Sequence, residues 1–388
     1  MNLINRIVER FFPPVKKLPA GIYHYQAPPE AEFPYRLHLR IDQEGNGILI
    51  LNASTVLHLN LTAAEYAYHL IKRTPTDAVA EQVSSRYRIP AKQALADFQE
   101  FSQRLETMIT TPDLDPVAYL GLEREDPYSN VDTPYRLDCA LTYRTNDQDG
   151  KHLAPVERVK RELITGEWKT ILQKAWEAGI PHVIFTGGEP TLRPDLPELI
   201  AFAEELGMVT GLLTDGLRLT EKDYLHSLLR SGLDHMMILL DPQEDQSWEA
   251  VRDAIAEDVF ITVHITVTAA NHEKLKKYLK KLAEMGVKNI SLSANSPKLK
   301  DALMESRKAA ANFGLNLAWD LPVPYSSFNP VALELTETDP STGANAGGGK
   351  AWLYVEPDGD VLPAQGENTV LGNLLTDPWE KIWPSGKT

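Results

Sequence analysis

Hydrophobic and polar positions follow two different patterns along the chain, and the pattern changes near residue 134. In the first part, short apolar runs between turn-forming residues predict three strands within residues 35–59. Apolar residues at helical spacing then predict three helices, at residues 62–73, 76–87 and 90–109. A capping box from Thr62 to Glu65 opens the first of them. Strands followed by three helices in ~75 residues indicate a small winged-helix-like α+β domain.

From residue 134 onward, strands alternate with helices, after a proline-containing linker at residues 111–133. Apolar runs predict six strands, at residues 135–143, 182–185, 209–213, 236–240, 261–267 and 289–293. Helical periodicity predicts helices at residues 165–178, 195–206, 221–231, 247–256, 273–285 and 297–313. Such βα units with right-handed crossovers predict an α/β fold, a partial (βα)6 TIM-like barrel that binds ligands at the carboxyl ends of its strands.

The last part of the chain predicts a small α+β cap. Residues 351–365 have a hairpin pattern with a turn at residues 357–360. A short helix follows, capped at Thr376 and starting at Pro378. We therefore expect a first domain, a linker, a barrel and a C-terminal extension, at residues 1–110, 111–133, 134–320 and 321–388.

The net charge and the absence of long apolar runs limit which kinds of partner the protein is expected to bind. A formal net charge of -15 argues against nucleic acid, because phosphate binding relies on clustered Lys and Arg. We find no apolar run long enough to cross a bilayer and no signal peptide, so a cytoplasmic protein is expected. Residues 1–12 have helical apolar spacing, which leaves open contact with a membrane surface or a terminal helix packed on the protein.

Cys139 is the only cysteine in the sequence. A single cysteine excludes an intrachain disulfide and any zinc or iron–sulfur site built from several thiolates of one chain. Cys139 falls inside the first predicted barrel strand, where a buried cysteine acts as a small apolar side chain. We therefore interpret it as a core residue and not as a ligand or nucleophile.

The strongest motif directly follows the second barrel strand and contains Thr186, Gly187, Gly188, Glu189 and Pro190. Two glycines let the backbone approach a ligand closely, and a carboxylate beside exposed backbone groups can hold an ammonium group. A glycine turn with a surface glutamate would explain the two glycines alone. The complete string at a strand end favours a ligand site.

This motif resembles the Gly-Gly-Glu-Pro motif of the radical S-adenosylmethionine (radical SAM) superfamily. Similar segments end the first, third, fourth and fifth barrel strands, at residues 141–144, 213–216, 239–242 and 266–271. The resemblance implies S-adenosylmethionine as cofactor, with residues 186–190, Asp215 and Asp241 in its pocket. It also implies a [4Fe–4S] cluster held by three cysteines after the first strand, spaced three and then two residues apart.

The chain departs from this family where those cysteines would stand. Counted from Arg144, the positions are Thr145, Asp149 and His152, and none of them is a thiolate. A hydroxyl, a carboxylate and an imidazole are weak ligands for a low-potential cluster. We therefore predict no [4Fe–4S] cluster, no homolytic cleavage of the cofactor, and only weak binding of S-adenosylmethionine.

Both ends of the chain resemble parts of peptide-modifying enzymes. Residues 47–52 and 59–109 are similar to the PqqD-like peptide chaperone of pyrroloquinoline quinone biosynthesis, the general RiPP recognition element. That family binds a leader peptide as an added strand at its sheet edge. The alternative is a winged helix that only packs on the next domain. Residues 351–383 resemble the SPASM or twitch extension, but Ala364 stands where that family often has a cluster cysteine.

Further polar residues are predicted near the strand ends. They are Asp138, Arg144, Asp215, Asp241, His264 and Asn295. Grouped around one mouth, acids, a base and a histidine could perform acid–base chemistry. We favour a second interpretation, in which they are hydrogen-bonding remnants of a cofactor pocket.

The sequence thus predicts a degenerate radical SAM-like protein, a pseudoenzyme in a RiPP-type peptide-modification pathway. It would bind a peptide, a maturase partner or an S-adenosylmethionine-like ligand without radical chemistry. Two alternatives stay open. One is an active maturase whose [4Fe–4S] cluster is unconventional or supplied by a partner. The other is a closed-shell S-adenosylmethionine-dependent transferase that reuses the pocket.

Overall fold

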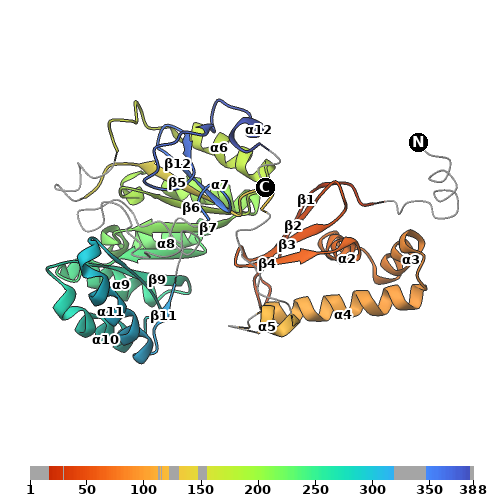
Figure 1. Cartoon of the computed structure of the whole chain (residues 1–388), viewed down its shortest axis with the longest axis horizontal. Coiled ribbons are helices and arrows are strands. Elements are labelled where there is room, and N and C mark those ends of the chain that lie inside the picture. Colours follow the sequence, from red (N-terminus) through yellow and green to blue (C-terminus); the bar gives the residue numbers. More distant parts are fainter. Residues whose placement is uncertain are drawn as a thin grey trace. The chain divides into compact units, whose positions relative to one another are not determined.

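The chain divides into two compact units, Met1–Glu125 and Asp126–Thr388, whose elements are labelled in Figure 1. The structure, a computed structural model, describes residues 17–28, 30–111, 114, 116–121, 131–146, 155–318 and 347–384. Residues 1–12, for which contact with a membrane surface and a packed terminal helix were both left open, lie outside these ranges. No helix within the described ranges is long and apolar enough to span a membrane.

The described residues of the first unit form a four-stranded antiparallel sheet. Its strands lie side by side in chain order, as β1 (Gly21–Gln26), β2 (Arg36–Ile41), β3 (Gly47–Leu51) and β4 (Thr55–Leu59). The three strands predicted within residues 35–59 are confirmed. Strand β1 was not predicted from the sequence; none of its six residues is fully buried, and the alternation is limited to Tyr23, His24, Tyr25 and Gln26.

Three helices follow the sheet, at the predicted places to within two residues. They are α2 (Leu61–Ile71), α3 (Thr76–Tyr87) and α4 (Ala91–Thr110), with the short α5 (Pro116–Leu120) in the predicted linker. The predicted capping box is wrong, because the helix starts one residue earlier and Asn60 caps it by accepting a hydrogen bond from the Ala63 amide at 3.0 Å. Glu65 faces the interior instead, where its carboxylate lies 2.8 Å from Arg86 Nε.

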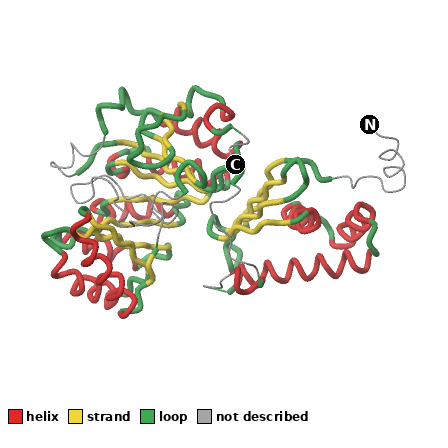
Figure 2. The backbone as a smooth tube through the Cα atoms, viewed as in Figure 1, coloured by secondary structure: helices red, strands yellow, loops and turns green. Residues whose placement is uncertain are grey.

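The second unit is built on a parallel sheet whose central strands follow chain order. They are β5 (Arg136–Thr142), β6 (His182–Gly187), β7 (Val209–Thr214), β8 (His235–Leu239), β9 (Phe260–Val267) and β10 (Asn289–Ala294). The helices are α6 (Thr165–Glu177), α7 (Leu196–Leu206), α8 (Lys222–Arg230), α9 (Asp245–Ile255), α10 (Leu275–Met285) and α11 (Lys300–Asn312). This order confirms the predicted α/β fold with (βα)6 connectivity, and Figure 2 shows helices flanking these strands.

The main core lies between this sheet and its helices. Leu137, Cys139 and Leu141, alternate residues of β5, are fully buried in it together with Trp168 and Ile171 of α6. Burial raises the pKa of the Cys139 thiol well above its ordinary value. The interpretation of this cysteine as a core residue is confirmed.

The C-terminal segment extends the same sheet. β12 (Trp352–Val355) pairs in parallel with β5, and β13 (Asp360–Leu362) and β14 (Gly372–Asn373) follow in antiparallel pairing. With β11 (Asn316–Leu317) at the other edge, the described residues form ten strands of this sheet. The hairpin predicted within residues 351–365 is confirmed, and it continues the barrel sheet as additional strands.

Lys174 of α6 ties the end of the chain to the barrel. Its ammonium group donates at 2.8–3.3 Å to the carbonyl oxygens of Leu374, Leu375 and Asp377. The short α12 (Trp379–Ile382) follows. The predicted cap at Thr376 is wrong, because Pro378 is the N-cap residue and the Thr376 amide donates to Asn373 Oδ1 at 3.3 Å.

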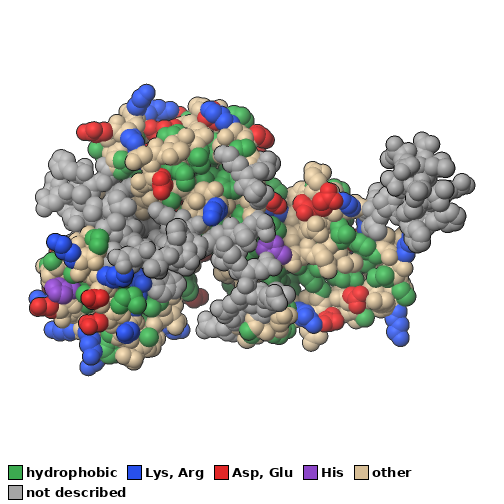
Figure 3. Space-filling model, viewed as in Figure 1, with side chains coloured by type: hydrophobic (Ala, Val, Ile, Leu, Met, Phe, Trp, Pro, Cys, Tyr) green, Lys and Arg blue, Asp and Glu red, His purple; other side chains and the backbone are tan. Residues whose placement is uncertain are grey.

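Charged side chains are scattered over the face of the molecule in Figure 3. Lys and Arg alternate there with Asp and Glu over the described elements of both units. A phosphate backbone is bound by a contiguous basic surface. The described side chains visible in this view form no such surface.

Candidate functional site

The two motif glycines lie where the chain after β5 runs alongside the end of β6. The Gly188 amide donates to the Thr142 carbonyl at 2.8 Å, and the Glu189 amide donates to the Arg144 carbonyl at 2.7 Å. A Cβ atom on Gly187 would collide with the Thr142 carbonyl oxygen, and one on Gly188 with that of Arg144. Gly187 also has a φ of 132°, a backbone conformation that residues with a side chain rarely adopt. The glycines are therefore required first by the close approach of two backbone segments.

The Glu189 carboxylate is buried and engaged by donors within the chain. Oε1 accepts from the Thr191 amide at 2.8 Å and from the Thr214 hydroxyl at 2.9 Å, while Oε2 accepts from the Asp215 amide at 2.7 Å. Burial, and next the neighbouring Asp215 carboxylate, raise the pKa of Glu189 to about 8. This carboxylate therefore joins the loop after β6 to the end of β7.

The remaining residues predicted for the cofactor pocket lie at neighbouring strand ends. Thr186 is fully buried in β6, and its hydroxyl oxygen has no hydrogen-bond partner in the described part of the chain. Pro190 starts a short 3-10 helix. Asp215 accepts from the side chain of Asn146 at 2.8 Å, and Asp241, after β8, accepts from the Gln243 amide at 2.9 Å. The structure thus gathers residues 186–190 with Asp215, and places Asp241 one strand beyond.

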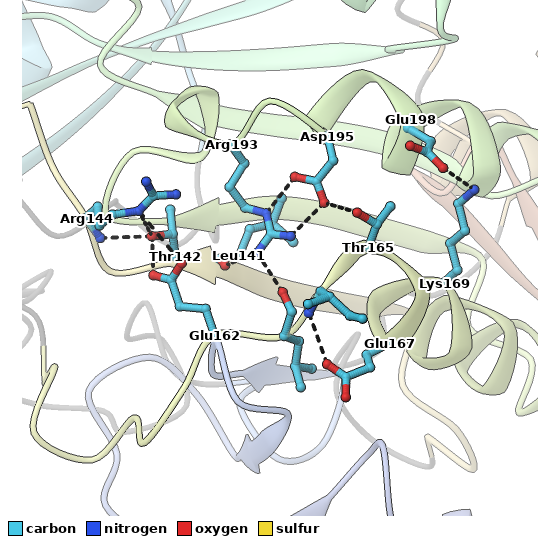
Figure 4. Close-up of polar contacts among 12 residues, drawn as sticks. Leu141, Thr142, Arg144, Glu162, Thr165, Glu167, Lys169, Arg193, Asp195 and Glu198 are labelled. Atoms are coloured by element: carbon cyan, nitrogen blue, oxygen red, sulfur yellow. Dashed lines mark hydrogen bonds and ion pairs between the residues drawn. The ribbon is translucent and has the colours of Figure 1, made fainter.

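Arg193 organises the same region and is a residue that sequence reasoning did not single out (Figure 4). It is buried, and its guanidinium forms two bonds of 2.6 and 2.9 Å with Asp195 at the start of α7. A third nitrogen donates to the carbonyls of Leu141 and Leu163, at 3.2 and 2.9 Å. The sequence did offer a signal for Arg193, because it stands in the motif string two residues before Asp195. A buried charge needs such a partner nearby.

A cavity of about 470 Å³ opens at the end of β5. Small-molecule sites commonly have volumes of ~300–1,000 Å³. Its lining residues are Tyr143, Arg144, Thr145, Val156, Val159, Arg161, Glu162 and Leu192. Of these, Tyr143, Arg144, Thr145 and Leu192 lie in or beside segments that sequence reasoning named. Val156, Val159, Arg161 and Glu162 lie in a segment without helical or strand periodicity. Glu162 accepts a short hydrogen bond from the Thr142 hydroxyl and forms an ion pair with Arg144 at 3.7 Å.

The C-terminal segment reaches this cavity through Glu356, which directly follows β12. The Glu356 carboxylate is buried, accepts from the Tyr143 hydroxyl at 2.8 Å and pairs with Arg158 at 2.6 Å. Burial raises the pKa of Glu356. This contact fixes the ring of a cavity-lining residue from outside the barrel.

Two of the polar residues predicted at the mouth lie elsewhere. Asp138 is near the start of β5, buried against Arg136 of the same strand at 2.7 Å. His264 is in the middle of β9, where its ring nitrogens lie 3.0 Å from the hydroxyls of Ser291 and Ser293. Burial lowers the pKa of His264 to about 3. The grouping around one mouth is therefore wrong for both, because they sit two or more residues before the strand ends. Asn295 does follow β10.

The donor set at the end of β5 does not fit a [4Fe–4S] cluster. Thr145 offers a hydroxyl, while Asp149 and His152 lie outside the described residues. Cys139 supplies the only thiol, and it points into the core between sheet and helices. Such a cluster takes thiolates as its ligands. An S-adenosyl ligand does fit, since the buried Thr186 hydroxyl has no partner beside the glycine loop.

A (βα)6 parallel sheet with a Gly-Gly-Glu loop after its second strand defines a partial barrel of the radical SAM type. A family profile described as "Radical SAM superfamily" matches residues 139–256. The PqqA peptide cyclase of Streptomyces rochei is 30% identical over 261 residues, which cover 60% of this chain and 71% of that protein. The PqqA peptide cyclase of Xanthomonas oryzae pv. oryzae (strain MAFF 311018) is 27% identical over 264 residues, which cover 59% of this chain and 68% of that protein. The chain therefore belongs to the radical SAM superfamily and is related to the PqqA peptide cyclases.

Solved structures share the fold. Streptococcus suis SuiB bound to S-adenosylmethionine has a TM-score of 0.60 at 17% identity, covering 89% of this chain and 86% of its own. SuiB bound to its precursor peptide SuiA has a TM-score of 0.58 at 15% identity over the same shares. A match over 89% of 388 residues extends beyond the second unit, which begins at Asp126, so the likeness in fold includes part of the first unit.

Proposed function

We propose that this chain is a radical SAM-fold protein without a radical-generating cluster, acting in the cytoplasm as a peptide- or partner-binding component of a RiPP-type modification pathway. The observation that carries this is the donor chemistry at the end of β5, where a hydroxyl stands first and the chain's only thiol points into the core. Relatedness to PqqA peptide cyclases, and the likeness to SuiB with its precursor peptide, support a peptide-related role.

The two ends of the chain serve that role in this proposal. The first unit acts as a PqqD-like recognition element with a winged-helix-like fold. Its strand β4 has β3 as its only strand neighbour among the described residues, so its outer edge is available for an added strand. The segment after β11 is a shortened SPASM or twitch extension, in which Ala364 is buried where a cluster cysteine would stand.

The pocket at the end of β6 retains an S-adenosyl ligand in this proposal. Residues 186–190 and Asp215 would hold it, with the Thr186 hydroxyl as a hydrogen-bond donor from inside the sheet. When bound, such a ligand supplies a sulfonium centre. Because Glu189 is engaged by internal donors, its carboxylate is not available for the ammonium group of the ligand.

We expect the purified chain to be colourless and to take up no [4Fe–4S] cluster. Anaerobic reconstitution with iron and sulfide, followed by gel filtration, should leave well under one iron per chain, because three thiolates are lacking. Iron analysis and visible absorption measure this. About four irons per chain with charge-transfer absorption would support the active-maturase alternative instead.

A PqqA precursor peptide labelled with fluorescein is expected to bind the full chain, as followed by fluorescence anisotropy. Strand addition relies on backbone donors, so a proline at the centre of the paired segment should weaken binding at least tenfold by removing one of them. An alanine at the same place is the matched control. Equal binding of the proline and alanine peptides, or no binding of either, contradicts strand addition.

A further inference from the structure

Arg144 lines the β5-end cavity with part of its hydrogen-bonding capacity unused. Its Nε lies 3.1 Å from the Thr142 hydroxyl and 3.7 Å from Glu162 Oε2. Its terminal nitrogens Nη1 and Nη2 have no partner in the described part of the chain, and Figure 4 shows no bond reaching them. The guanidinium is therefore held by one edge, while the two-nitrogen fork that suits a carboxylate stays open.

Beside Arg144, the Glu162 carboxylate has one oxygen that accepts no hydrogen bond from the described residues. Oε1 accepts from the Thr142 hydroxyl. Oε2 has only the Arg144 ion pair among the described residues, and 3.7 Å is too long for a hydrogen bond. Since the side chain is 31% exposed, Oε2 can accept a donor from the cavity.

The other ionic side chain of the cavity is already neutralised. Arg161 forms two bonds of 2.6 and 2.7 Å with Glu167, which lies outside the cavity lining. The remaining wall is apolar at Val156, Val159 and Leu192. The cavity thus presents an open cation, an open anion and an apolar wall.

We infer that this cavity binds the head group of an α-amino acid, with the carboxylate on the Arg144 fork and the ammonium group at Glu162 Oε2. An apolar side chain lies against the valines and Leu192. The inference rests on the proposed function, because a cluster at Thr145 would occupy this place. A free amino acid and the methionyl end of an S-adenosyl ligand share this chemistry.

Calorimetric titration of the full chain with three probes tests each charge separately. The probes are L-methionine, L-methioninamide without the carboxylate, and N-acetyl-L-methionine without the ammonium group. We expect both derivatives to bind at least tenfold more weakly than methionine, since each loses one charge-assisted bond. Arg144→Met should remove the preference for methionine over the amide. Glu162→Gln should remove the preference over the N-acetyl compound.

Lys169→Met is the matched control, because Lys169 is a cation paired with Glu198 away from the cavity lining (Figure 4). It should retain the wild-type affinities. S-adenosylhomocysteine and 5′-methylthioadenosine, which lacks the head group, separate the sources. Tighter binding of S-adenosylhomocysteine than of methionine, lost equally in Arg144→Met, supports an S-adenosyl ligand. Equal binding of the two supports a free amino acid, and both results support the head-group site.

The inference is overturned if neither methionine nor S-adenosylhomocysteine binds the wild-type chain, or if Arg144→Met binds methionine and its amide with the wild-type ratio. Thermal unfolding of each variant checks that it is folded. The reconstitution experiment separates the two proposals. An iron-free chain that binds neither methionine nor S-adenosylhomocysteine refutes the head-group site alone, whereas a chain with a full cluster refutes the proposed function.

Discussion

Gly187→Ala is expected to destabilise the second unit by about 4 kcal/mol, through backbone strain and overpacking together. The residue has a φ of 132°, and an added Cβ would collide with the Thr142 carbonyl oxygen. That oxygen belongs to backbone paired with Gly188 and cannot move without breaking the bond. Strain and collision therefore act at the same atom.

Gly166→Ala is the matched control, because nothing lies within 4 Å of a Cβ added there, near the start of α6. Alanine in a helix should stabilise this position by ~0.5–1 kcal/mol. Urea unfolding followed by tryptophan fluorescence measures both variants, since all seven tryptophans lie in Asp126–Thr388. Equal midpoints for the two variants would show that the loop yields freely at Gly187.

The radical SAM motif of this chain makes structural contacts that do not depend on a cluster. Gly187 and Gly188 admit the backbone after β5, and Glu189 holds the end of β7. Arg193 holds the end of β5 and the start of α7 through Asp195. Loss of the cluster ligands would leave every one of these contacts in place. The motif therefore indicates the fold, and it does not indicate radical chemistry.

Periodicity predicted the elements but not the pairing of distant segments. The six barrel strands were predictable because each is a continuous apolar run followed by an amphipathic helix. The parallel pairing of β12 with β5 joins residues more than two hundred positions apart, and no local pattern encodes it. The helix start at Leu61 was missed because Asn60 and Thr62 are both good N-cap residues.

The candidate site was predictable only where it lies on the motif. Glu162 and Arg161 belong to a segment without periodicity, so nothing local assigns them to a cavity. His264 was placed near a strand end, although the predicted strand at residues 261–267 already ended at Val267, where β9 ends. Its neighbours Ser291 and Ser293 come from β10, and only the parallel register brings them to the imidazole.

We expect acid to destabilise the second unit through its buried histidines. Burial lowers the pKa of His264 to about 3 and that of His235 to about 4. His182 shares a 2.8 Å ring-to-ring hydrogen bond with His235, and its pKa is lowered well below its ordinary value. Below a pH of about 6.5 the unfolded chain binds protons that the folded chain does not. This stabilisation is complete above that pH and is lost as the pH falls toward the folded pKa values.

Glu189 changes the stability with pH in the opposite direction to the histidines. Its pKa is raised to about 8, so the folded state keeps a proton that an unfolded glutamate releases above a pH of about 4.3. Its contribution is therefore present in acid and is lost as the pH rises toward 8. Between pH 7 and pH 4.5, the histidines lower the stability while Glu189 raises it.

Variants of the two groups separate these opposing effects. For His264→Asn, the fall in unfolding free energy from pH 7 to pH 4.5 should be smaller than in the wild type by about 3 kcal/mol, because two pH units below 6.5 are worth ~1.4 kcal/mol each. For Glu189→Gln, the fall should be larger, since the group that gains stability in acid is gone. Urea unfolding at both pH values measures the difference within each variant, which cancels the loss of packing that either substitution causes. An unchanged fall in His264→Asn would mean that His264 takes up its proton in the folded chain as readily as in the unfolded chain, which contradicts a lowered pKa for this residue.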